Sequence, residues 1–187
     1  MSARARGVEQ TRARIVAAAR SAFVAQRYDQ VTLSGVARES GVTQQTLLNH
    51  FSSKEGLFLA AVEVLGGEIR ELRGEVKPAD VKGCVQALMR QYEVLGDANV
   101  RLVAVADIIP VVAEIAEMAR KDHRSWLESI FADILPTAPA PRRQRIAALY
   151  AVTDVGTWKL LRRDLGHSRR ETTTILHSTI RSILATA

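Results

Sequence analysis

Four consecutive side chains near the N-terminal third of the chain can donate and accept hydrogen bonds: Thr43, Gln44, Gln45 and Thr46. They follow Gly41, and glycine suits the left-handed position just past a helix end. A glutamine amide can bond adenine through two atoms at once, and a threonine methyl group can pack on a thymine methyl group. This pattern favours contact with base edges in the DNA major groove over covalent catalysis.

Two short helices must position these side chains. Thr32 is typical of an N-cap for a helix that ends near Ser40, and Thr43 is typical of an N-cap for a helix over residues 44–51. The apolar residues at helical spacing predict the inner face of the pair: Val36, Ala37, Val42, Leu47 and Phe51. The sequence therefore predicts a helix-turn-helix, whose second helix lies in the major groove.

Three flanking residues are candidates for phosphate contacts. Thr32 and Lys54 each stand at a predicted helix N-terminus, where free amides attract an anion, and His50 stands at the end of the second helix. Every candidate DNA contact also has a structural alternative. Thr32 and Thr43 can be helix caps and nothing more. Gln44, Gln45 and Lys54 can be ordinary surface groups and His50 can satisfy a backbone group, so only their joint spacing around Gly41 favours DNA.

Helical periodicity extends along nearly all of the chain and predicts an all-α fold of about nine helices. We expect an N-terminal three-helix domain over residues 1–53 and a larger helical bundle over residues 54–187. Gly96-Asp97, Pro110 and the Pro-rich segment at 136–141 are predicted breaks. The helices expected from this punctuation cover residues 8–27, 32–40, 44–51, 54–76, 79–95, 99–109, 111–135, 142–165 and 168–185.

Charge is distributed unevenly over the 187 residues, whose formal net charge is +6. Residues 1–55 hold eight basic and four acidic side chains, whereas residues 56–140 hold nine basic and thirteen acidic ones. A basic N-terminal segment beside an acidic middle is typical of a localised site for a polyanion. Residues 141–170, with eight basic and two acidic side chains, show that positive charge alone does not locate DNA.

Composition also narrows the class of protein. The single cysteine, Cys84, excludes an intramolecular disulfide and a multi-cysteine metal site, and the histidines at 50, 123, 167 and 177 lack metal-ligand spacing. We therefore expect no metal, no cofactor and no catalytic residue. No apolar run of membrane-spanning length and no signal-peptide core occurs, which predicts a cytoplasmic protein.

The segment from Thr32 to Leu57, with T…VA…GVT..TL..HF.SKE.LF, resembles the DNA-binding domain of the TetR family of bacterial transcriptional regulators. This resemblance implies a homodimer that binds a palindromic DNA operator, represses transcription and is released by a small-molecule effector. An alternative is a regulator of the same fold that responds to a protein partner or to its own abundance. Combined with the spacing argument, the resemblance predicts DNA contacts from Thr32, Ser34, Thr43, Gln44, Gln45, Thr46, Leu48, Asn49, His50 and Lys54.

Two residues depart from the family pattern. Leu48 stands where members usually carry a tyrosine that meets DNA, which removes that contact or turns it into an apolar one. Gly35 lies inside a predicted helix, at a cost of roughly 0.5–1 kcal/mol relative to alanine. The base contacts of relatives therefore cannot be transferred directly.

The resemblance assigns dimerisation to the last two helices. Candidate interface residues are Ile146, Tyr150, Thr153, Ile175, Leu176, Thr179, Ile180, Ile183 and Leu184. Their alternative is the core of the same chain. Candidate effector-pocket residues are Met89, Tyr92, Asp107, His123, Trp126, Asp154 and Trp158, and core packing is again the alternative. Asp107 and Asp154 stand among apolar neighbours, and a buried carboxylate needs a partner.

Overall fold

The computed structural model of the chain describes residues 3–185, and the side chains of residues 5–185. Nine α-helices and no strand occur in that part of the chain, which confirms the predicted all-α fold. The residues form two compact units, one up to Arg70 and one from Glu71. The division lies near the end of α4 (Lys54–Arg73), so our predicted boundary before Lys54 stays a prediction.

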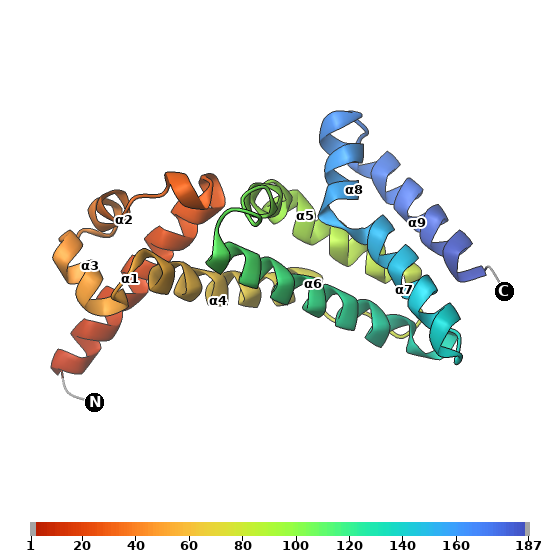
Figure 1. Cartoon of the computed structure of the whole chain (residues 1–187), viewed down its shortest axis with the longest axis horizontal. Helices are drawn as coiled ribbons and strands as arrows, with labels where there is room; N and C mark the ends of the chain where they lie inside the picture. The colour runs from red at the N-terminus through yellow and green to blue at the C-terminus, as the bar shows by residue number, and fades with distance from the viewer. Residues whose placement is uncertain (1–2, 186–187) are drawn as a thin grey trace. The chain divides into compact units, whose positions relative to one another are not determined.

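The first unit consists of α1 (Ala3–Ala25), α2 (Leu33–Ser40), α3 (Gln44–Phe51) and most of α4. Figure 1 shows α2 and α3, in orange, as two short helices beside the longer α1. Apolar side chains from all four helices fill its core, among them Ile15, Ala19, Phe23, Val36, Leu47, Leu57 and Phe58. The Arg20 guanidinium on α1 donates to the Glu68 carboxylate on α4, with Nε 2.9 Å from Oε1.

The second unit contains α5 (Val81–Val103), α6 (Pro110–Phe131), α7 (Pro139–Thr153), α8 (Val155–Lys159) and α9 (Arg169–Ala185). A π-helical turn, η3 (Leu160–Asp164), continues α8. In Figure 1, α9, in blue, runs beside α7, which passes from cyan to light blue. Buried residues of α5, α6, α7, α8 and α9 form one apolar core, which includes Leu88, Leu127, Leu149, Trp158, Leu176 and Ile180.

The predicted break at Gly96-Asp97 is wrong, because α5 continues through it to Val103. The indole of Trp158 lies against the Gly96 backbone, where an added Cβ would come within 2.6 Å of the ring atom Cη2. The glycine therefore serves close packing of α8 on α5 rather than a helix end. Consequently the separate helix predicted over residues 99–109 does not form, and residues 104–108 make turns.

The helix predicted over residues 142–165 is also wrong, because α7 ends at Thr153 and a new helix begins at Val155. Asp154 adopts an extended backbone between them, and its carboxylate accepts a hydrogen bond from the Gly156 amide at 2.7 Å. Aspartate is among the best N-cap residues, since its side chain satisfies an amide that the helix leaves free. Asp154 stands as an N-cap residue within a run of helical apolar periodicity, and this signal for a helix boundary was missed.

Charged pairs fix α8 and η3 on α5. The Glu93 carboxylate accepts from Arg162 at 2.6 and 2.9 Å and from the Trp158 indole nitrogen at 3.2 Å. Arg163 pairs with Asp97 and stacks over the Trp158 ring, 4.6 Å from its centre. These contacts lower the pKa of Glu93, first through the bond to Arg162. Arg162 and Arg163 therefore both bond to carboxylates of the same chain.

Candidate nucleic-acid interface

The turn between α2 and α3 has the predicted local geometry. Thr32 Oγ1 accepts from the Gly35 amide at 3.1 Å, and Thr43 Oγ1 accepts from the Thr46 amide at 3.1 Å. Both threonines are therefore N-caps, as predicted. Gly41 ends α2 in the left-handed conformation, with φ at 68°. This confirms the helix-turn-helix geometry.

The third helix has an apolar inner face and a polar outer face. Leu47 is 0% exposed and Phe51 is 7% exposed, so both anchor α3 in the core of the first unit. The exposed side chains of this helix and its cap are Thr43, Gln44, Gln45 and Asn49. Gln45 Nε2 donates to Asn49 Oδ1 at 3.0 Å, which orients these two amides. Gln44 and Gln45 thus keep donors and acceptors available to another molecule.

Thr46, Leu48 and His50 are only half-buried on the same short helix. The Thr46 hydroxyl lies 2.9 Å from the Thr43 hydroxyl, so both belong to the cap as well as to the outer surface. The His50 ring is tilted beside the Phe51 ring, with 6.1 Å between their centres. The partial exposure of Leu48 leaves it able to make the apolar contact that we expect in place of a tyrosine.

Lys54 begins α4, as predicted, but is not an ordinary surface charge. Its ammonium nitrogen lies 4.5 Å from the centre of the Tyr28 ring, within the range of a cation–π contact. Partial burial lowers the pKa of Lys54, and the nearby Asp29 carboxylate opposes this effect. The ring holds the cation at the start of α4, where a phosphate would also meet the free amides of that helix.

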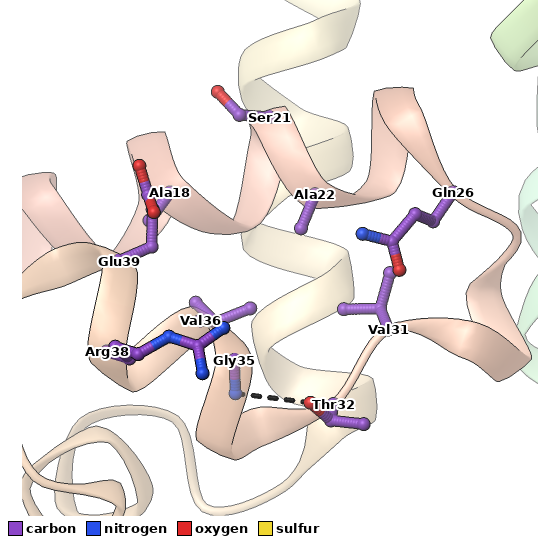
Figure 2. A pocket seen from close by; sticks show the side chains of 10 residues that line it. All are labelled: Ala18, Ser21, Ala22, Gln26, Val31, Thr32, Gly35, Val36, Arg38 and Glu39. Atoms are coloured by element: carbon purple, nitrogen blue, oxygen red, sulfur yellow. Dashed lines mark hydrogen bonds between the residues drawn. The ribbon is translucent and has the colours of Figure 1, made fainter.

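An open cleft of about 380 Å³ lies between α1 and α2. Figure 2 shows the side chains that line it, Thr32 among them. Gly35 also lines it, and a Cβ added there would lie 3.0 Å from the Thr32 cap oxygen. Gly35 therefore leaves room for the cap. Arg38, one turn further along α2, lines the same cleft and is exposed. Sequence reasoning did not select Arg38, although its spacing of three from Gly35 was a usable signal.

The predicted effector-pocket residues lie in different surroundings in the second unit. Met89, Tyr92 and Trp158 are core residues, and the Tyr92 hydroxyl donates to the Thr153 carbonyl oxygen at 2.9 Å. Asp107 is exposed, so our expectation of a buried carboxylate there is wrong. Asp154 is half-buried and its partner is the Gly156 amide. Both aspartates interrupt the helical pattern instead of lying on an apolar helix face.

His123 and Trp126, from the same predicted pocket, both contact the half-buried Arg73. The Arg73 guanidinium donates to Gln91 Oε1 at 2.6 Å, lies 3.0 Å from His123 Nδ1 and stacks over the Trp126 ring at 4.3 Å. Burial lowers the pKa of Arg73. His123 Nε2 contacts the Thr153 hydroxyl at 2.9 Å. These contacts form a continuous polar network, so any pocket role of its members stays a prediction.

The predicted dimerisation residues divide into two sets. One set is buried in the core of the single chain and comprises Ile146, Thr153, Leu176 and Ile180. The other set is only partly buried and comprises Tyr150, Ile175, Thr179, Ile183 and Leu184. Residues of the first set already have their packing partners within the chain. A second copy would therefore meet the second set.

Among the described residues, no group of three or more His, Cys, Asp or Glu side chains is placed to hold a metal ion. The helices of residues 3–185 also include none that is long and apolar enough to cross a membrane.

Comparison with known proteins agrees with this geometry. Residues 15–61 match the family model described as bacterial regulatory proteins, tetR family. Those residues include the C-terminal part of α1, all of α2 and α3, and the start of α4. A search of curated proteins finds no match.

Solved structures show that the fold extends over both units. A transcriptional regulator from Rhodococcus sp. Rha1 is 22% identical, with a TM-score of 0.71 over 91% of this chain and 94% of that one. A tetR-family transcriptional regulator from Streptomyces coelicolor is 16% identical, with a TM-score of 0.76 over 94% of this chain and 80% of that one. At these identities the likeness concerns the fold.

Proposed function

We propose that the chain is a transcriptional repressor of the tetR family of bacterial regulatory proteins, whose family model its residues 15–61 match. In this proposal it binds a palindromic operator as a homodimer in the cytoplasm and is released by a small-molecule effector. It acts by binding alone and catalyses no reaction. The observation that carries the proposal is the exposed polar face of α3, held in place by the buried Leu47 and Phe51.

In this proposal, one group of residues contacts the bases of the operator and another contacts its phosphates. Gln44 and Gln45 would bond base edges, while Thr43, Thr46, Leu48 and Asn49 would contact the adjacent bases or sugars. Thr32, Ser34, His50 and Lys54 would contact phosphates on either side, and such contacts set register and affinity without reading sequence. Arg38 joins this second group, because it lines the same cleft as Thr32.

The proposal is tested by fluorescence anisotropy with the DNA upstream of the protein's own gene. Gln44→Ala should lose about 1–3 kcal/mol of discrimination at one base pair. Lys54→Met, which keeps the stem over Tyr28, should instead weaken binding to all sequences and flatten the salt slope by about 1. Lys82→Met, at an exposed position of α5, is the control and should leave both quantities unchanged.

The assignment of base and phosphate contacts requires that Gln44→Ala changes base discrimination and that Lys54→Met changes the salt slope. A uniform loss for Gln44→Ala would make it a positioning residue, and an unchanged salt slope for Lys54→Met would remove the phosphate contact. If the protein shows no salt-dependent binding to any DNA, the proposal that it is a DNA-binding regulator is refuted. A second candidate, a regulator of the same fold controlled by a protein partner or by abundance, is favoured if no small molecule changes operator affinity.

A further inference from the structure

An open groove lies between α6 and α7 in the second unit. Its volume is about 400 Å³. Arg124 and Glu128 line it from α6, while Arg142, Arg143 and Tyr150 line it from α7. This volume falls within the range of roughly 300–1,000 Å³ that small-molecule sites occupy.

The groove has an excess of positive charge. Three arginines face it with one glutamate, and no ion pair between described residues joins Arg124, Arg142 or Arg143 to a carboxylate. Arg142 and Arg143 also stand near the N-terminus of α7, whose first turn contains no acidic residue. Since the helix dipole is positive there, both arginines add to a potential that an anion would neutralise.

The floor of the groove is apolar. Ile146 is 4% exposed, and Ala147 presents a methyl group one residue further along α7. Tyr150 lies one turn beyond Ile146, and its ring packs edge-on against the buried His123 ring, 5.1 Å away. The apolar floor and the cationic rim together match a molecule with a hydrocarbon part and an anionic end.

We propose that this groove binds a small anionic amphiphile, in which a carboxylate or phosphate group is attached to a hydrocarbon chain. Arg142 and Arg143 would hold the anionic group, and Ile146, Ala147 and the Tyr150 ring would contact the chain. The role of this ligand as effector rests on the proposed function, whereas the binding site itself does not. None of the effector-pocket residues predicted from the sequence lines the groove, but two residues predicted for the dimer interface, Ile146 and Tyr150, do line it.

Calorimetric titration of the full chain with four probes tests the chemistry of the groove. Octanoate or octyl phosphate should bind at least about tenfold more tightly than 1-octanol, because only the anions can form charge-assisted hydrogen bonds with the arginines. Acetate should bind at least as weakly as 1-octanol. The tighter of the two anions identifies the head group. Failure of both octyl anions to bind, or equal binding of 1-octanol or acetate, would overturn the proposal.

Substitutions locate the site. The double variant Arg142→Gln, Arg143→Gln should weaken octyl-anion binding about tenfold or more and leave 1-octanol unchanged. The matched control is Arg169→Gln, Arg170→Gln, which removes two exposed arginines from the first turn of α9 and should bind like the wild type. Ala147→Phe fills the groove from an exposed position and should abolish binding without unfolding the chain.

Two further measurements distinguish a ligand site from a contact between copies and from a site without regulatory effect. If the double variant changes the oligomeric state rather than the octyl-anion affinity, the groove is an interface between copies and the proposal fails. Operator binding is measured on the same variants without ligand. If the protein binds its operator and the octyl anion does not change the affinity, only the effector role is refuted. If the wild type binds no DNA at all, the proposed function is refuted.

Discussion

His123 lies between two groups that fix its tautomer. The Arg73 guanidinium only donates, so His123 Nδ1 accepts from it, and His123 Nε2 carries the proton that it donates to Thr153 Oγ1. The Thr153 hydroxyl in turn donates to the Leu149 carbonyl oxygen at 2.7 Å. A second proton would place a charge on a buried imidazole beside the Arg73 cation, so the folded protein keeps the ring neutral.

This arrangement predicts how stability depends on pH. Burial, followed by the charge of Arg73, lowers the pKa of His123 from 6.5 to about 3. As pH falls through 6.5, the unfolded chain binds a proton that the folded chain does not bind until about pH 3. The free energy of unfolding should therefore fall by up to about 1.4 kcal/mol per pH unit in this window.

Urea unfolding at several pH values measures this slope in the wild type and in His123→Gln. The carboxylates contribute to both proteins, so the difference between the two slopes isolates the imidazole. We expect the variant to be less stable at neutral pH but to have the shallower pH dependence between pH 6.5 and pH 4. Equal slopes would mean that the His123 imidazole binds its proton over the same pH range in the folded and the unfolded chain.

Close packing between elements rests on Gly96. Gly96→Ala should destabilise the second unit by about 1–3 kcal/mol, because the new methyl group overlaps the Trp158 ring. Urea unfolding followed by circular dichroism measures this loss. In a Trp158→Leu background the same substitution should cost much less, since the ring is gone. An equal cost in both backgrounds would place the strain in α5 itself.

Gly96 also illustrates where sequence reasoning fails. Local signals sufficed for the first unit, because Thr32, Gly41 and Thr43 act within one helical turn and the structure confirms each of them. In the second unit the meaning of Gly96 depends on Trp158, more than sixty residues away in the chain. The groove between α6 and α7 likewise brings together Arg124 and Arg142, which no short spacing relates.

At the scale of the whole molecule, a palindromic operator requires two copies whose recognition helices are about 34–36 Å apart, or a multiple of that. The periodicity of α9 suits either a core or an interface, and within one chain only part of the apolar stripe is buried. Thr172, Leu176 and Ile180 are buried in the chain, whereas Ile175 and Thr179 are partly exposed one position away. A charge at Ile180 would therefore unfold the chain rather than test dimerisation.

Thr179→Arg is the sharper test of the dimer. Among the described residues, the Thr179 hydroxyl donates to the Ile175 carbonyl oxygen at 2.8 Å. Because Thr179 is partly exposed, an arginine side chain can extend outward without leaving a cavity in the core. We expect sedimentation equilibrium to show a monomer and operator affinity to fall, because one half-site contact remains per molecule. Ser178→Arg, on the exposed adjacent position of α9, should stay dimeric. If Thr179→Arg also remains a dimer with full operator affinity, the two copies pair through a surface other than α9.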